Sequence, residues 1–161
     1  MKKYELTEET VTVYGKTLYR IRAVRDFGSV KTREFGGYIE KEENLSHFGN
    51  AWISGDARVS GDARVYGNAW VYGNARVSGD AEVFNTRHFF VQGPIGSRDG
   101  YVTFYRTKDD TVEVRCGCFS GSLQKFVDRV EETHGGSRYE KEYKLAAELA
   151  KVCIRLEGES R

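Results

Sequence analysis

The chain has 161 residues, which fits one domain or two very small ones and excludes a large multidomain enzyme. Its 25 lysine and arginine residues balance 24 aspartate and glutamate residues, so the formal net charge is +1. This charge cannot hold a long nucleic acid or a membrane surface through a global field, so any recognition of charge has to be local. No run approaches the roughly 18 apolar residues of a membrane span, and no apolar leader occurs, so we expect a cytoplasmic protein.

Residues 10–24 are predicted to form a β-hairpin. β-branched and aromatic residues alternate on both sides of Gly15 and Lys16, which is typical of two antiparallel strands joined by a tight turn. Residues 35–39 and Leu45 then look like an irregular first turn of the repeat that follows. We expect this end of the chain to cap the repeat.

Six hexapeptides run from Phe48 to Val83 without an insertion: FGNAWI, SGDARV, SGDARV, YGNAWV, YGNARV and SGDAEV. An aliphatic residue closes each one, and an alanine follows four residues after it, so both positions are predicted to point inward. Glycine followed by asparagine or aspartate tolerates the positive φ that a corner requires. Each hexapeptide is therefore a short strand and a corner, and three of them close a triangle.

This repeat resembles the left-handed β-helix of hexapeptide-repeat proteins. The predicted fold is mainly β with a C-terminal α+β part: a short left-handed parallel β-helix of about two to three coils, flanked by an N-terminal β-hairpin and by a C-terminal β-hairpin with two helices. The expected domains are residues 1–87, the hairpin cap and β-helix, and residues 88–161, a ββαα module.

A triangle of three hexapeptides places every eighteenth side chain in one column. Trp52 and Trp70 should therefore stack in an outward slot and form an aromatic ledge, which could pack under flanking segments, form a subunit interface or stack a base. Arg58 and Arg76 should also stack. Like charges in register are unfavourable, so they point to a bound anion or a partner's carboxylate, unless both side chains splay into water.

The C-terminal part is predicted to contain strands at 101–106 and 111–119, followed by two helices. Ser120 or Ser122 can cap the first helix, which ends at Gly135. The second helix should run from about 137 to 156. It carries two apolar stripes, more than one small sheet can cover, so one of them is predicted to contact another subunit.

The segment Gly93–Gly100 is the strongest candidate for a binding loop. Its glycines can expose backbone N–H groups, Ser97 adds a hydroxyl, and Arg98 can form a bidentate contact with phosphate. Tyr101 and Tyr105 share one face of the next strand, beside Arg98, as in a nucleotide pocket. The alternative is a turn that only joins two modules, with ordinary half-buried tyrosines.

The predicted functional residues form two sets. The ligand-binding set is Gly96, Ser97, Arg98, Tyr101, Tyr105, Arg58, Arg76 and His88. The interface set is Trp52, Trp70, Leu145, Leu149 and Val152.

No metal, cofactor or catalytic set is expected. Cys116 and Cys118 lack a second pair of ligands at zinc spacing and share strand parity with valines, so they are predicted to be small core residues. Hexapeptide acyltransferases, as the resemblance implies, use a histidine that projects from the coil. Here only His47 and His88 flank the coils, so an acyltransferase is the least favoured function.

The opening YELTEETVTVYGKTLYRIRAV, the segment FGGYIEKEENLSHFGNAWISGDARV and the later GPIGSRDGYVTFYR and VRCGCFSGSL resemble a group of small β-helix proteins of phages and prophages of Gram-positive bacteria. Small phage proteins of this size include anti-defence factors that sequester nucleotide immune signals, such as cyclic ADP-ribose derivatives or cyclic dinucleotides. The resemblance therefore implies a non-enzymatic homo-oligomer, a dimer or trimer, that captures a small phosphorylated ligand in the bacterial host cytoplasm. The alternative is a protein-binding inhibitor or structural module that acts on a host complex.

Overall fold

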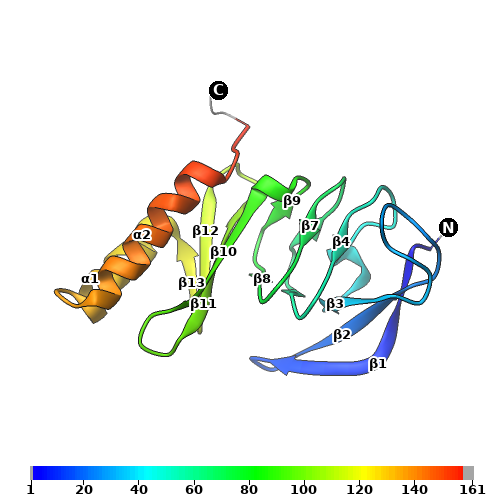
Figure 1. The fold of residues 1–161 in the computed structure, drawn as a ribbon, viewed down its shortest axis with the longest axis horizontal. Helices are drawn as coiled ribbons and strands as arrows, with labels where there is room; N and C mark the ends of the chain where they lie inside the picture. Colours follow the sequence, from blue (N-terminus) through cyan, green and yellow to red (C-terminus); the bar gives the residue numbers. More distant parts are fainter. Residues whose placement is uncertain (1, 158–161) are drawn as a thin grey trace.

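The computed structural model describes residues 2–157, which form a row of layers (Figure 1). A solenoid of short strands occupies the middle. The N-terminal hairpin runs along one flank of the solenoid, a four-stranded sheet covers one of its ends, and two helices cover the outer face of that sheet. The chain is thus mainly β with two C-terminal helices, as predicted.

The predicted N-terminal hairpin is confirmed. Strands β1 (Tyr4–Val13) and β2 (Lys16–Ala23) pair antiparallel, and both turn residues, Tyr14 and Gly15, have positive φ. Strand β3 (Phe35–Ile39) pairs antiparallel with β2 and parallel with a solenoid strand. After the short helix η1 (Glu42–Asn44), Leu45 also bridges the solenoid, so this segment forms the predicted irregular turn.

The hexapeptides form a β-solenoid with the predicted period. Each contributes a two-residue strand, and strands three hexapeptides apart pair in parallel, β4 with β7, β5 with β8 and β6 with β9. The six corner glycines have φ between +61° and +70°, and the inward alanines and aliphatic residues are at most 1% exposed. The strands are β4 (Trp52–Ile53), β5 (Arg58–Val59), β6 (Arg64–Val65), β7 (Trp70–Val71), β8 (Arg76–Val77) and β9 (Glu82–Val83).

The predicted tryptophan ledge is wrong in one respect. Trp52 and Trp70 are in register, but Trp52 is completely buried and meets the Phe27 ring edge-on, with 5.2 Å between ring centroids. Strand β3 lies close over it because Gly36 has no side chain: a Cβ there would lie 2.7 Å from the Trp52 ring. Packing under a flanking segment therefore accounts for Trp52, which is not available at a surface. Trp70 is half-buried.

The first end of the solenoid is closed by donors from outside the repeat. A parallel strand at an open end leaves backbone groups unpaired, and unpaired buried groups are costly. At this end the backbone carbonyls of the first coil are left unpaired. On each of the three sides of the solenoid, an N–H group from outside the repeat donates to one of them. The Ala51 carbonyl accepts from Lys3 Nζ at 2.6 Å, the Ala57 carbonyl from the Tyr38 N–H at 2.9 Å, and the Ala63 carbonyl from Asn44 Nδ2 at 2.9 Å.

The other end has the opposite need, because there the backbone N–H groups are left over. Side-chain acceptors from the following segments fill this need on all three sides. The Trp70 N–H donates to Thr86 Oγ1 at 3.4 Å, the Arg76 N–H to Thr103 Oγ1 at 2.9 Å, and the Phe84 N–H to His88 Nδ1 at 3.2 Å. Thr86 and His88 belong to the short helix η2 (Thr86–His88).

The C-terminal strands form a sheet of four, where a hairpin of two was predicted. The antiparallel order is β10 (Phe89–Ile95), β11 (Gly100–Arg106), β12 (Val112–Cys116) and β13 (Phe119–Ser122). The segment taken as one strand, 111–119, reverses at Gly117, whose φ is +57°.

Both predicted helices are confirmed. Helix α1 (Leu123–His134) has Ser122 as N-cap, with the side chain accepting from the Lys125 N–H, and helix α2 (Arg138–Cys153) follows after Gly135 and Gly136. Among the residues that the structure describes, no helix is both long enough and apolar enough to cross a bilayer.

The two faces of the sheet belong to different cores. Tyr105 and Phe89 join the solenoid interior, whereas Phe104 and Val102 pack with α1 and α2. The sheet therefore lies between the solenoid and the helices. The end of the sheet that carries the β10–β11 and β12–β13 turns lies beside both.

Candidate functional site

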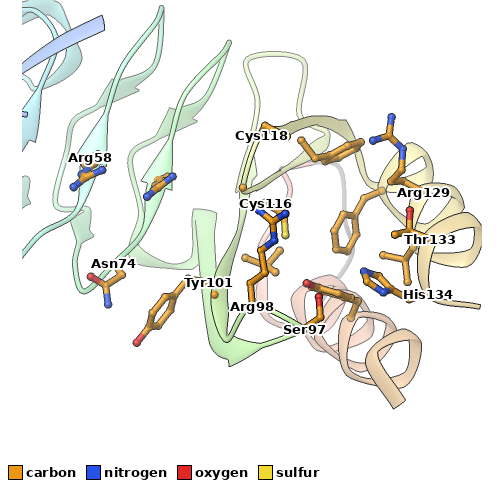
Figure 2. A pocket seen from close by; sticks show the side chains of 18 of the residues that line it. Arg58, Asn74, Ser97, Arg98, Tyr101, Cys116, Cys118, Arg129, Thr133 and His134 are labelled. Carbon is orange, nitrogen blue, oxygen red and sulfur yellow. The ribbon is translucent and has the colours of Figure 1, made fainter. Parts of the chain in front are cut away.

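A cavity of about 710 Å³ lies where the solenoid, the turns of the sheet and helix α1 meet (Figure 2). Its lining comes from four regions of the chain. The solenoid gives Asp56, Arg58, Asn74 and Arg76; the β10–β11 turn and β11 give Ser97, Arg98, Gly100, Tyr101 and Val102; the β12–β13 turn gives Cys116, Gly117, Cys118 and Phe119; and the helices give Phe126, Arg129, Val130, Thr133, His134 and Tyr143.

The solenoid wall carries two arginines in register. Arg58 on β5 and Arg76 on β8 are direct partners in the parallel pairing, which places the strands roughly 4.8 Å apart. Both are half-buried and both line the cavity. We call Arg58 and Arg76 the solenoid arginines.

The sheet wall is formed by the segment that was predicted to bind an anion. Ser97 and Arg98 lie in the β10–β11 turn, and Tyr101 follows at the start of β11, with 43% of its surface exposed. Figure 2 shows Arg98 directed from this turn toward Cys116. Ser97, Arg98 and Tyr101 thus place polar groups at this end of the sheet.

The helix wall combines aromatic rings with one more arginine. Arg129 of α1 lies over the Phe119 ring, 5.6 Å from its centroid. Phe126 meets Tyr143 edge-on at 5.8 Å, and His134 lies 5.5 Å from the same tyrosine ring. We call Arg98 and Arg129 the turn–helix arginines.

The cavity is locally cationic in a chain of almost no net charge. Its lining, counted over residues 2–157, holds four arginines and one carboxylate, Asp56, giving a formal balance of +3. Asp56 is already paired with Arg20, whose Nη2 lies 3.4 Å from Oδ1. Within residues 2–157, none of the four cavity arginines forms an ion pair, so their charge is available to a ligand.

Two of the ionisable side chains in the cavity, Cys116 and Tyr143, are held in their neutral forms by burial. Burial raises the pKa of the Cys116 thiol, and burial together with nearby Cys116 raises the pKa of Tyr143 to about 12. A thiol that stays protonated is a poor nucleophile. These two groups therefore offer weak hydrogen bonds rather than reactive anions.

Five of the eight predicted ligand-binding residues line this one cavity, although they come from distant parts of the sequence. They are Arg58, Arg76, Ser97, Arg98 and Tyr101.

The other three need correction. Tyr105 is completely buried in the solenoid core, because β11 covers the end of the solenoid with that face. His88 is 4% exposed, and it caps the Phe84 N–H away from the cavity. The Gly96 N–H is occupied by Glu142 Oε1 at 2.8 Å, so it is not open to a phosphate.

The helix wall was missed in the sequence. Arg129 and Thr133 are spaced i and i+4, and Phe126 and Val130 have the same spacing. Residues four apart lie on one face of a helix, so Arg129 and Thr133 form a polar stripe next to the apolar stripe of Phe126 and Val130. This spacing was the signal in the sequence that could have identified the helix wall. His134 ends the same helix.

The cysteines and the interface candidates also have definite places. Cys116 is half-buried, but Cys118 is exposed in the β12–β13 turn, so the prediction of two core cysteines is wrong for Cys118. Within residues 2–157, no group of three or more histidine, cysteine or acidic residues is placed to hold a metal ion. The predicted outer stripe of α2 lies at the surface, with exposed fractions of 69% for Leu145, 47% for Leu149 and 68% for Val152.

Comparison with known proteins bears on the solenoid. The family model of the YdcK beta-solenoid repeat matches in overlapping copies at residues 51–67, 57–73, 63–79 and 69–83. The matched part is the repeat alone, and it supports the β-solenoid rather than an activity. A search among curated proteins found no match.

Proposed function

We propose that this protein binds a small phosphorylated ligand of the nucleotide class in the cavity, without changing it chemically. The observation that carries the proposal is the convergence of Arg58, Arg76, Arg98 and Arg129 on one cavity without carboxylate partners among the described residues. Guanidinium groups bind phosphate through paired N–H donors, and such charge-assisted bonds are among the stronger ones in proteins.

The arrangement of Arg58 and Arg76 supports an anion as the occupant. Two like charges in register repel each other, and a phosphate between them would convert this repulsion into attraction. Among the described residues that line the cavity, Asp56 is the only carboxylate, and it is engaged by Arg20 and does not supply that compensation.

The aromatic lining supports a base or another ring as the second part of the ligand. Tyr101, Phe119, Phe126 and Tyr143 all line the cavity. Stacking on such rings is worth about 1–3 kcal/mol per base. Ser97 and Thr133 add hydroxyl groups for sugar or base atoms.

The side chains of the cavity favour binding of a ligand over catalysis. Burial raises the pKa of the Cys116 thiol, and a thiol that stays protonated is a poor nucleophile. An acyltransferase would act through His47 or His88, and both lie away from the cavity: His47 stacks on Tyr4 and His88 caps the solenoid.

The wider role that we propose is sequestration of a nucleotide immune signal, which would inhibit a bacterial defence system. This step comes from the resemblance to phage proteins. From the same resemblance we also propose that the solenoid winds left-handed, that the protein acts in the host cytoplasm and that it forms a dimer or trimer.

Titration calorimetry tests the proposal. Purified protein would be titrated with AMP, ADP-ribose and cyclic di-AMP, and we expect heat from at least one of them and loss of that heat in Arg98→Ala. Arg64→Ala is the control. Arg64 has the same place in its hexapeptide as Arg58 and Arg76 have in theirs, but it lies on another side of the solenoid. No heat with any nucleotide, or equal loss in Arg64→Ala, would contradict the proposal.

A second candidate function is protein binding through helix α2. Leu145, Leu149 and Val152 are exposed on one face of this helix, whereas Ala146, Ala147 and Ala150 pack inward. An inhibitor of a host complex could use such a stripe. A stoichiometric protein partner in a host lysate that is lost in Leu149→Lys would favour this function; a co-purifying ultraviolet-absorbing small molecule would favour the first.

A further inference from the structure

Resting on the proposed function, we infer that the ligand crosses the end of the sheet, with its phosphate on the solenoid side and its base on the helix side. The ligand would then carry base and phosphate at opposite ends, as a nucleoside monophosphate does. Gly100, at the border between the two sides, would be the residue that leaves room for the crossing.

The cavity extends over both faces of the four-stranded sheet. Along β11 the side chains alternate between the faces, so that Tyr105 joins the solenoid core and Val102 the helix core. Tyr101 has the same parity as Tyr105, and Thr103 between them accepts from the Arg76 N–H, so Tyr101 faces the solenoid. Because Tyr101 and Val102 both line the cavity, a ligand that fills it has to pass the end of the sheet.

The part of the cavity on the solenoid side is polar. It is lined by Asp56, Arg58, Asn74, Arg76 and Tyr101, and we call it the solenoid lobe. Its two arginines are in register on neighbouring strands, and its carboxylate is engaged by an arginine outside the cavity. Since guanidinium groups form strong charge-assisted bonds with phosphate, this lobe suits the phosphate of the ligand.

The part on the helix side is largely apolar, and we call it the helix lobe. Six of its residues belong to the hydrophobic core between the sheet and the helices: Val102, Cys116, Phe119, Phe126, Val130 and Tyr143. Burying a charge among such side chains is costly, whereas a base can stack on their rings. Thr133 and His134 add polar atoms for the edge of a base. The turn–helix arginines lie at the border of this lobe, in the β10–β11 turn and on the exposed side of α1.

Figure 2 shows the two lobes on opposite sides of the sheet. Arg58, Asn74 and Tyr101 lie on the solenoid side, and Thr133 and His134 lie on the helix side. The sheet itself therefore separates the phosphate site from the base site.

Gly100 marks the place where the ligand would cross. It is the first residue of β11 and lines the cavity. Its backbone does not require glycine, because its φ lies outside the left-handed region. Packing does not require glycine either, because a Cβ there would meet none of the described atoms within 4 Å. A missing side chain at this position does, however, leave the border between the lobes open.

The experiment compares AMP with its two ends, adenine and inorganic phosphate. Titration calorimetry measures AMP, and ligand-observed NMR measures the two fragments. We expect adenine and phosphate to bind the wild type at the same time, each in its own lobe. AMP should bind at least about tenfold more tightly than either fragment, because it occupies both lobes.

Gly100→Val tests the crossing. It should reduce the affinity for AMP by at least about tenfold and leave the binding of adenine and phosphate unchanged, because each fragment stays within one lobe. Gly100→Ala should have a smaller effect in the same direction. Thermal melts like that of the wild type would show that both variants fold.

Variants within the lobes test the orientation. Arg58→Ala with Arg76→Ala should weaken phosphate binding by at least about tenfold and spare adenine. Thr133→Trp, at an exposed position of α1, should fill the helix lobe and have the reverse effect. The controls are Arg64→Ala and Glu132→Trp, the latter at an exposed position of α1 outside the cavity lining, and both should bind the two fragments like the wild type.

The outcomes separate this inference from the proposed function. If Gly100→Val binds AMP like the wild type, if the arginine variant loses adenine as well as phosphate, or if Thr133→Trp spares adenine, this inference is overturned and the proposed function stands. If no nucleotide binds the wild type, both are overturned.

Discussion

The side-chain oxygen of Thr103 accepts a hydrogen bond from the backbone N–H of Arg76 at 2.9 Å. This bond joins the end of the solenoid to strand β11 and satisfies an N–H that would otherwise be left over there. It also fixes one cavity wall against another, because Arg76 and Tyr101 both line the cavity.

Replacing this acceptor should destabilise the protein. Thr103 is 1% exposed, so Thr103→Val keeps the shape of the side chain but leaves the Arg76 N–H buried without its partner. We expect a loss of about 1–3 kcal/mol in the free energy of unfolding. Urea denaturation measures it, and Thr103→Ser, which keeps the hydroxyl, should lose clearly less. Equal losses in both variants would mean that packing of the methyl group, rather than the hydrogen bond, dominates.

Adding one methyl group at Gly36 should also be costly. A Cβ there would lie 2.5 Å from the Ile53 carbonyl oxygen and 2.7 Å from the Trp52 ring, so β3 would have to move away from the solenoid. Gly36→Ala should lower the free energy of unfolding by about 1–3 kcal/mol or more. Gly100→Ala is the control, because a Cβ at Gly100 meets no atom within 4 Å. Similar thermal melts for both variants would rule out the tight approach of β3.

Acid should weaken the cap formed by His88. Burial, reinforced by the charge of Arg106, lowers the pKa of His88 from 6.5 to about 4. Between these values the unfolded chain binds the proton more readily, so stability falls as the pH falls from 6.5 to about 4. The contribution is at most about 3 kcal/mol.

His88→Asn tests this dependence, because its side-chain oxygen can still accept from the Phe84 N–H without titrating in this range. The difference in the free energy of unfolding between the wild type and His88→Asn should become smaller as the pH falls. Parallel stability profiles for the two proteins between pH 7 and pH 4 would be evidence against the role of His88; these pH limits bracket the shift.

Charge repulsion between the solenoid arginines should be measurable in the absence of ligand. Arg76→Gln removes one of two like charges in register, so the unliganded protein should gain a few tenths of a kcal/mol at low ionic strength. The gain should shrink as salt is added. Arg64→Gln should instead be neutral or slightly destabilising, because Arg64 is in register with Glu82. A loss of stability in Arg76→Gln at low salt would show that the guanidinium groups do not repel.

The outer stripe of α2 should decide the oligomeric state. We expect the wild type to sediment as a dimer or trimer and the variant Leu145→Lys with Leu149→Lys to sediment as a monomer. The exposure of both leucines predicts little change in the melting temperature of the monomer itself. Lys151→Gln, at an exposed position of the same helix away from this stripe, is the control. A monomeric wild type would exclude this interface.

The parts of the fold that repeat could be predicted from the sequence. The hexapeptide period fixed the solenoid register, including Arg58 beside Arg76, because one residue type recurs at every inward position. The helices were equally clear, since Ser122 and Gly135 mark the ends of α1. The turn at Gly117 was missed because the residues on both sides continue the alternation of one strand.

Non-repeating contacts account for the remaining errors. Tyr105 and Trp52 occupy positions that a strand pattern leaves at a surface, and each was buried by a separate segment, the solenoid end for Tyr105 and β3 for Trp52. The cavity could be predicted only in part for the same reason. Arg129 reaches it through the packing of α1 on the sheet, which no local pattern records.

Closure of both solenoid ends has a consequence for assembly. A stack of parallel strands with bare ends could add further copies head to tail and grow into a filament. Here Lys3 and Asn44 stop growth in one direction, and Thr86, Thr103 and His88 stop it in the other. These capping side chains come from outside the repeat. Inserting or deleting three consecutive hexapeptides would therefore change the length of the solenoid and leave the caps at both ends in place.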